Sequence, residues 1–294
     1  MDEKLAHVPP EKLALLNDML GQVSRIKGVA AIVLGGSYAS RTQRPDSDLD
    51  IGIYYREESP FDIPDIKRVA NILASGGDAT VTQFYEWGAW VNGGAWIHTP
   101  QGKMDFLYRN IEHVQRTIAE AGEGISHHDY DQQPAYGFYS VMYLAETQIC
   151  IPLFDPKGVI SDLKTRVAVY SPKLKENIIA ASLWSAEFTL IHARGFAERG
   201  EVYAVAGCLT RAAANLTQAL FALNERYFMR DKQVFREIAE FEYMPENYTF
   251  QLERILAAPG GTPDTLQQTV SAMEKLWRQV AVLPDVNYRA QFIL

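Results

Sequence analysis

Two short stretches, each next to an apolar run, contain residues that contribute nothing to a hydrophobic core. The first is Gly35-Gly36-Ser37, which follows the run VAAIVL, and the second is Asp48-Leu49-Asp50, which opens the run LDIGIYY. Glycine permits a sharp turn and lets a ligand approach the backbone closely. Backbone N–H groups beside a serine hydroxyl favour an anion such as a phosphate. The first stretch therefore predicts a phosphate site.

The second stretch predicts a site for a divalent cation. If Asp48 and Asp50 lie in a strand, their side chains point to the same face. Two carboxylates about 6 Å apart repel each other by roughly 3 kcal/mol at an effective dielectric of about 20, and a cation between them removes that cost. Ligation by oxygen alone favours Mg²⁺ or Mn²⁺. Taken singly, an ordinary tight turn and a capped strand entry remain the alternatives for the two stretches.

A third acid belongs to the same argument. Asp105 is a lone acid in the strand-like run KMDFLYR. If that strand lies beside the one carrying Asp48 and Asp50, three carboxylates converge at the Gly36–Ser37 turn. Such a set suits two-metal phosphoryl or nucleotidyl transfer.

Apolar periodicity predicts the elements that would position these residues. The order over the first 110 residues is helix, strand, strand, helix, strand, strand, which indicates a mixed sheet with helices against it. The ranges are 11–26, 29–34, 48–55, 62–75, 94–99 and 103–109, the last two joined by a turn at 100–102.

Beyond about residue 110 the pattern changes to apolar residues at three- and four-residue spacing, which is typical of a helical bundle. The predicted helices cover residues 111–122, 135–150, 175–200, 201–228 and 262–283.

With these elements, the motifs resemble the polymerase-β-like nucleotidyltransferase superfamily, whose minimal members include the aminoglycoside and lincosamide nucleotidyltransferases. The shared pattern is a glycine pair or Gly-Ser after an apolar residue, about ten residues, and then Asp-apolar-Asp; it spans roughly residues 30–108. The resemblance implies an α+β fold with a small mixed β-sheet nucleotidyltransferase domain in residues 1–120. An all-α helical bundle domain that binds substrate would follow in residues 121–294.

The resemblance also assigns roles to the motif residues. Gly35–Ser37 would hold the triphosphate of a nucleoside triphosphate co-substrate. Asp48 and Asp50 would ligate Mg²⁺ or Mn²⁺, and Asp105 would complete the metal site or activate the acceptor hydroxyl. That hydroxyl would attack the α-phosphorus and expel pyrophosphate.

Arg41 departs from the family pattern, because many members have glycine at this position. If the position needs a positive φ, an arginine is strained there. Arg41 could instead supply a cation to the triphosphate.

Two glutamates on predicted helices, Glu146 and Glu187, are further candidates for the general base, although a solvated helix face is the default interpretation of each. Trp87, Trp90 and Trp96 lie close together in the sequence. An aromatic wall for a base or sugar ring and ordinary core packing are both open for them.

Composition limits the partners. The chain has 294 residues with 28 basic and 36 acidic side chains, a net charge of -8, which argues against nucleic acid as a partner. The two cysteines suggest no disulfide framework, no apolar run reaches the length of a membrane span, and the N-terminus lacks a signal-peptide pattern. We therefore expect a cytoplasmic protein with no membrane partner.

The predicted function is metal-dependent transfer of a nucleoside monophosphate, AMP from ATP, to a hydroxyl of a small molecule such as an aminoglycoside-like compound. A nucleotide-binding pseudoenzyme or regulatory module is the first alternative. A nucleotidyltransferase acting on a protein or RNA acceptor is the second.

Overall fold

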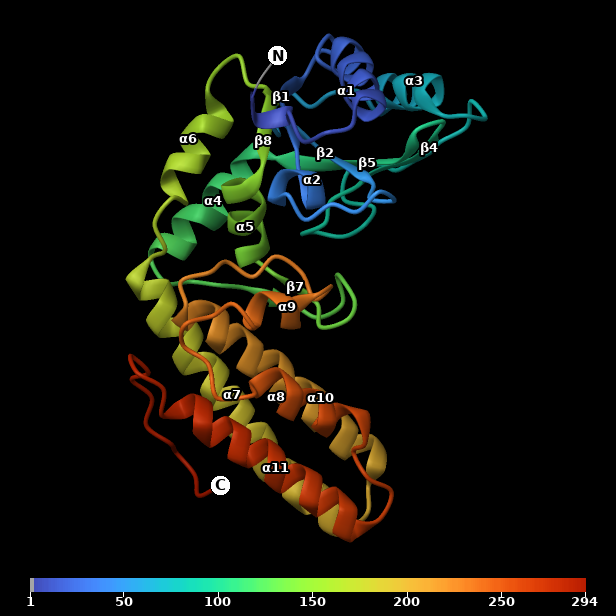
Figure 1. Cartoon of the computed structure of the whole chain (residues 1–294). Helices are drawn as coiled ribbons and strands as arrows, with labels where there is room; N and C mark the ends of the chain where they lie inside the picture. Colours follow the sequence, from blue (N-terminus) through green and yellow to red (C-terminus); the bar gives the residue numbers. More distant parts are fainter. Residues whose placement is uncertain (1–2) are drawn as a thin grey trace. The chain divides into compact units, whose positions relative to one another are not determined.

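The computed structural model describes residues 3–294 (Figure 1). The chain forms two compact units, one of Met1–Ala119 with His127–Val169 and one of Glu120–Ser126 with Tyr170–Leu294. The sequence placed a boundary at residues 120 and 121. The structure adds residues 127–169 to the first unit, because a strand within them pairs with the sheet described next.

The first unit is built on a six-stranded mixed sheet in the order β3-β4-β5-β2-β1-β8. The strands are β1 (Val29–Leu34), β2 (Leu49–Tyr55), β3 (Thr80–Val81), β4 (Gly94–Thr99), β5 (Gly102–Asn110) and β8 (Ile151–Phe154). β2 and β5 pair in parallel, and the other neighbours pair antiparallel. The predicted mixed sheet with helices is thereby confirmed. β8 was not predicted, because it is a four-residue run directly after a helix.

Alternation along the strands separates the two faces of this sheet. On β2, Leu49, Ile51 and Ile53 are fully buried and join the hydrophobic core, whereas Asp50 between them is only half-buried. On β5, Phe106 belongs to the same core. Helices α1 (Pro10–Val23) and α3 (Ile63–Leu73) cover this apolar face, and their own buried residues complete the cluster.

The remaining elements of the first unit are short. They are the 3₁₀ helix η1 (Glu3–Leu5), the helices α2 (Gly36–Ser40), α5 (Val141–Ile149) and α6 (Val159–Arg166), and the two-stranded pair β6 (His128–Asp129) and β7 (Phe138–Tyr139). Helix α4 (Ile111–Gly122) begins directly after β5 and continues into the second unit.

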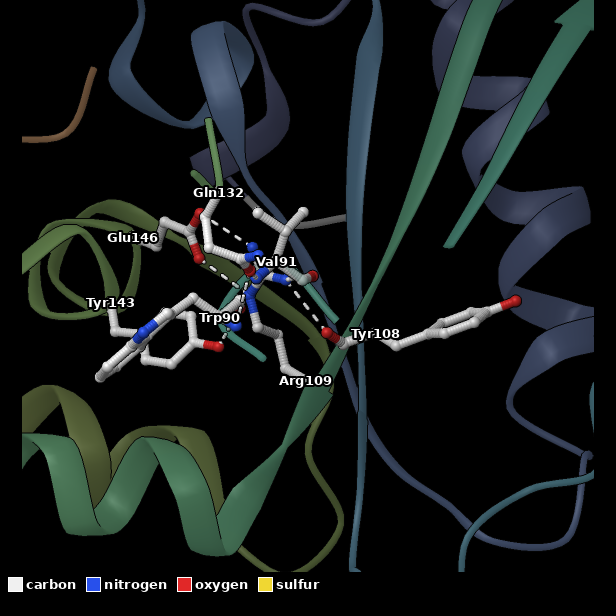
Figure 2. Close-up of polar contacts among 7 residues, drawn as sticks. All are labelled: Trp90, Val91, Tyr108, Arg109, Gln132, Tyr143 and Glu146. Atoms are coloured by element: carbon white, nitrogen blue, oxygen red, sulfur yellow. Dashed lines mark hydrogen bonds and ion pairs between the residues drawn. The ribbon is translucent and has the colours of Figure 1, made fainter. Parts of the chain in front are cut away.

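A buried ion pair holds α5 against the end of β5 (Figure 2). The Arg109 side chain is 4% exposed, and its Nε and Nη2 donate to the two carboxylate oxygens of Glu146 at 3.0 and 2.9 Å. Its Nη1 donates to the carbonyls of Val91 and Tyr108 at 3.2 and 3.0 Å. Figure 2 also shows the side chains of Tyr108 and Arg109 on opposite sides of β5, as strand alternation requires. Both oxygens of Glu146 are therefore engaged, which argues against a general-base role for it.

The loop before β4 is tied to the same cluster. The Tyr143 hydroxyl donates to the carbonyl of Trp90, and the Gln132 side-chain oxygen accepts from the Trp90 and Val91 N–H groups at 3.0 and 3.4 Å. The Trp90 ring stacks on Phe138 with centroids 5.6 Å apart. Trp90 is therefore a packing residue of the first unit.

The second unit is helical, as predicted. Its helices are α7 (Pro172–Glu198), α8 (Val202–Leu223), α9 (Val234–Ile238), α10 (Tyr248–Ala257) and α11 (Pro263–Ala281). The sequence analysis did not include α9 and α10. The indole N–H of Trp277 on α11 donates to the carbonyl of Leu183 on α7 at 3.0 Å. Among the helices of residues 3–294, none combines the length and the apolar character needed to cross a membrane.

Glu187 on α7 corrects an expectation, because the default of a solvated helix face is wrong for it. The side chain is fully buried. Its carboxylate accepts from the Tyr288 hydroxyl at 2.6 Å, the Gln291 N–H at 2.9 Å and the Phe292 N–H at 2.7 Å. Glu187 thus anchors the C-terminal segment to α7 and has no free oxygen for a catalytic role.

The ion pair at Arg109 predicts a stability difference between two glutamate variants. Glu146→Ala leaves the buried guanidinium of Arg109 without its carboxylate, so we expect a loss of about 3 kcal/mol of unfolding free energy. Glu112→Ala is the matched control, because Glu112 pairs with Arg56 at 2.8 Å where both side chains are more than a third exposed. That change should cost less than about 1 kcal/mol. Denaturant unfolding measures both, and equal losses would contradict a structural role for the buried pair.

Candidate functional site

Two of the predicted acids face each other across the central strand pair. In the parallel register of β2 and β5, Asp50 is the partner of Asp105, and adjacent strands lie about 4.8 Å apart. Both residues belong to the face opposite the α1–α3 core, and both are half-buried. Asp48 lies two residues before Asp50, directly ahead of β2. The structure therefore places Asp50 beside Asp105 on the sheet, with Asp48 within electrostatic reach of Asp105.

The surroundings of Asp105 raise the pKa of its carboxyl. Burial, and secondly the Asp48 carboxylate, raise the pKa of Asp105 from 3.8 to about 6, while Lys103 and His98 act in the opposite direction. A carboxyl with a pKa near 6 can exchange a proton close to neutral pH. The effect of Asp48 also shows that the two acids lie within electrostatic reach of each other.

The glycine turn is packed against the same acids. The Gly35 N–H donates to the carbonyl of Asp50 at 2.8 Å. Gly36 has a φ of +57°, and a Cβ placed on it would lie 1.7 Å from Asp50 Oδ2. Only glycine has both the backbone freedom and the missing side chain that this approach requires. The predicted phosphate turn and the predicted metal ligand are therefore in direct contact.

Arg41 does occupy the conformation that glycine favours. It is the C-terminal cap of α2, with φ 58° and ψ 32° in the left-handed region, and its side chain is exposed. A non-glycine residue pays roughly 1–2 kcal/mol for that conformation. The backbone strain expected for an arginine in place of the family's glycine is therefore present at Arg41. A role for its guanidinium at a triphosphate stays a prediction.

The residues fit a hard divalent cation by donor chemistry. Asp48, Asp50 and Asp105 offer oxygen ligands alone, the set that Mg²⁺ and Mn²⁺ prefer, and two of them are register partners. Within residues 3–294, however, no three or more His, Cys, Asp or Glu side chains are grouped closely enough to hold a metal ion.

The structure also separates the tryptophans that the sequence left together. Trp96 on β4 is the antiparallel partner of Asp105, so its side chain emerges on the face of the acids, and it is 50% exposed. Trp87 stacks on it, with centroids 4.8 Å apart and an interplanar angle of 25°.

The sequence analysis did not single out Arg109. A lone basic residue at the end of an apolar strand was the feature that could have indicated its buried ion pair.

A glycine turn thus lies against paired strand acids on a mixed sheet. Residues 16–119 match the model of the nucleotidyltransferase domain family, and the matched segment contains Gly35–Ser37 and all three acids. This segment of the chain is therefore similar to a nucleotidyltransferase domain, in agreement with the resemblance drawn from the motifs.

Among solved structures, the chain is similar to a nucleotidyltransferase-like protein from Exiguobacterium sibiricum, with 9% sequence identity and a TM-score of 0.46. The match covers 92% of this chain and 77% of that one. No curated protein matches the chain.

The contact between Gly36 and Asp50 predicts a destabilised alanine variant. Gly36→Ala should cost at least about 1–2 kcal/mol of unfolding free energy from its left-handed φ alone, and the added methyl must also displace the Asp50 carboxylate. Gly76→Ala is the control, because Gly76 has open space around its Cα and an ordinary φ; we expect it to change the free energy by less than about 0.5 kcal/mol. Equal denaturant midpoints for the two variants would refute the packing of the turn described above.

The electrostatics of Asp105 predict a pH dependence in metal-free protein. Because its folded-state pKa of about 6 lies above its ordinary value of 3.8, the folded protein holds this proton more tightly than the unfolded chain. The stabilisation is therefore complete below about pH 4 and is lost as the pH rises through about 6.

Carbon-13 NMR of the Asp105 carboxyl, recorded with a chelator present, measures this titration. Asp48→Asn should lower the pKa of Asp105, and Asp46→Asn, at an exposed position in the preceding loop, should leave it unchanged. Titration of Asp105 near pH 4, or no response to Asp48→Asn, would show that the two acids are not coupled.

Proposed function

We propose that the chain is a metal-dependent nucleotidyltransferase that moves a nucleoside monophosphate, AMP from ATP, to a hydroxyl of a small molecule and releases pyrophosphate. One observation carries the proposal. Asp50 is the register partner of Asp105 and also touches the glycine turn at Gly36, within the segment that matches the nucleotidyltransferase domain. The groups proposed to bind phosphate and to exchange protons are thus adjacent.

The glycine turn and Arg41 are proposed to bind the triphosphate. The backbone at Gly35–Ser37 would approach the phosphates closely, because glycine leaves no side chain in the way. The exposed side chain of Arg41 lies at the end of α2, and its guanidinium would add positive charge near the leaving pyrophosphate. An arginine kept in a strained conformation is consistent with such a role.

Asp48 and Asp50 are proposed to hold Mg²⁺ or Mn²⁺, with Asp105 beside them. When bound, the cation would neutralise phosphate charge and offset the repulsion among the carboxylates. The acceptor hydroxyl oxygen forms a bond to the α-phosphorus, the bond from the α-phosphorus to the bridging oxygen breaks, and pyrophosphate departs. Asp105 takes the hydroxyl proton, a role that its position beside Asp50 would allow.

The acceptor is proposed to be a small molecule rather than nucleic acid. A net charge of -8 and a site with three carboxylates both favour a neutral or cationic partner over a polyanion. A cytoplasmic location, expected from the two cysteines, is consistent with Cys150 and Cys208 being free thiols.

One observation favours a second candidate, a nucleotide-binding module without turnover. The described residues contain no closed group of three metal-ligating side chains, and a degenerate member of the superfamily could bind a nucleotide without transferring it. The experiment that follows separates the two candidates.

The paired acids predict a nucleotide response that depends on metal. ATP with Mg²⁺ at 100 times its dissociation constant should stabilise the protein by roughly 2.7 kcal/mol, seen as a higher melting temperature, and Asp48→Asn and Asp50→Asn should abolish that shift. Asp46→Asn should retain it. Asp105→Asn should keep nucleotide binding but lower the rate of pyrophosphate release with kanamycin as acceptor by at least about 100-fold.

The outcomes divide the candidates. A shift with ATP and Mg²⁺ but no pyrophosphate release from a panel of hydroxyl acceptors would favour the non-catalytic module. Wild-type turnover in Asp48→Asn or Asp50→Asn would remove these residues from the metal site.

A further inference from the structure

A buried lysine lies next to the elements that carry the candidate site. Lys12 is on α1, and the residue is 6% exposed. Within residues 3–294 it forms no ion pair with an Asp or Glu side chain. Removing an ammonium from water without an ionic partner costs free energy. The groups around Lys12 must therefore compensate for the lost hydration.

Three contacts surround the ammonium of Lys12. Its Nζ donates to the carbonyl of Ser47 at 2.5 Å and lies 5.1 Å from the centroid of the Tyr38 ring. A Cβ placed on Gly102 would lie 3.8 Å from the same Nζ, so the hairpin turn is next to it. A carbonyl oxygen and an aromatic face both stabilise a cation, and neither neutralises it. These contacts account for the burial of Lys12.

Each contact belongs to a different part of the candidate site. Ser47 directly precedes Asp48, and Tyr38 belongs to α2, the helix that begins at the glycine turn. Gly102 opens β5, three residues before Asp105. One side chain thus joins the loop before the paired acids, the helix after the phosphate turn and the hairpin that carries the third acid.

The loop that leads to Asp48 has few other anchors. The Ser47 N–H donates to the carbonyl of Arg44 at 3.0 Å, and the Arg44 N–H donates to the Ser47 hydroxyl at 2.8 Å, so both bonds stay inside the loop. For residues 43–47 the structure describes one hydrogen bond to a separate element, and Lys12 donates it. Because the peptide bond is planar, a fixed Ser47 carbonyl also fixes the peptide plane that ends at the Asp48 Cα.

Lys12 approaches from the core side of the sheet. Helix α1 covers the apolar face, and Tyr38, which the ammonium contacts, is 1% exposed and part of that core. Asp50 and Asp105 belong to the opposite face. Lys12 therefore acts on the site through the Ser47 carbonyl and does not contact the reacting groups.

We propose that Lys12 is a positioning residue, which holds Asp48 in the place where it ligates a divalent cation and ties that place to the glycine turn through Tyr38. The inference rests on the proposed function for the role of Asp48 as a metal ligand. Residues that orient a metal ligand typically change metal affinity by about 10–100-fold when they are replaced. Lys12 is such a residue at one remove along the backbone.

The test measures binding of Mn²⁺ alone to the full chain by electron paramagnetic resonance, without nucleotide. Lys12→Met keeps the apolar stem but loses the donor, and it should weaken binding by at least about tenfold. Lys12→Arg, whose guanidinium can donate to a carbonyl and stack on an aromatic ring, should stay within about threefold of wild type. Lys67→Met, at an exposed position of α3, is the matched control and should bind as wild type does.

A second measurement reports on the loop without metal. The nitrogen-15 order parameter of the Asp48 amide should be about 0.85 in wild type and fall below about 0.6 in Lys12→Met. An unchanged order parameter, or equal Mn²⁺ affinity in Lys12→Met and wild type, would overturn the proposal. So would an equal loss in Lys67→Met or no rescue by Lys12→Arg.

The same data separate this proposal from the proposed function. If wild type binds no Mn²⁺, the metal site of the proposed function is rejected. If wild type binds Mn²⁺ and Asp48→Asn does not, but Lys12→Met binds normally, the positioning role alone is rejected. Lys12→Gln, which keeps a neutral donor, is the second variant. Failure of both Lys12→Met and Lys12→Gln to fold would assign Lys12 to the fold and not to the site, which also overturns the proposal.

Discussion

The parallel pairing of β2 with β5 is the constraint on which the first unit depends. Among the strands of residues 3–294, these are the two neighbours that run in the same direction. Parallel neighbours need a crossover, since a tight turn returns the chain antiparallel, and here α3 and the strands β3 and β4 lie between them in sequence. The crossover supplies apolar cover for one face. The pairing itself places Asp50 beside Asp105 on the other face.

On that second face, β5 carries two charged residues with different surroundings, Arg109 and Asp105. Arg109, near the end of β5, is neutralised by a carboxylate that engages it through two hydrogen bonds. For Asp105, four residues earlier, burial and secondly the Asp48 carboxylate raise the pKa. An internally balanced charge stabilises a fold, whereas an unbalanced one is tolerated where an external group completes it. On the proposed function, the reacting groups lie at the Asp105 end of the strand.

The sequence was informative wherever a local pattern determined the structure. Strand alternation and the glycine pair predicted the acids, the turn and the central strands, because those features depend on residues close together in the chain. β8 was missed, since four residues after a helix carry little periodicity. Glu187 was misjudged because its partners lie about a hundred residues further on. Trp90 and Trp96 looked alike in sequence, and only the register of β4 against β5 distinguishes a packed ring from an open one.

The β4–β5 hairpin carries both Trp96 and Asp105, and its short connection is closed by the Thr99 hydroxyl, which donates to the carbonyl of Gly102 at 2.7 Å. The hairpin itself therefore sets the separation of the Trp96 and Asp105 side chains, about 5 Å between paired Cβ atoms. An acceptor hydroxyl that gives its proton to Asp105, the role proposed for this residue, must fit beside an indole whose position the hairpin sets. On the proposed function, regioselectivity among several chemically similar hydroxyls would follow from strand spacing, before any contact with the rest of the acceptor is considered.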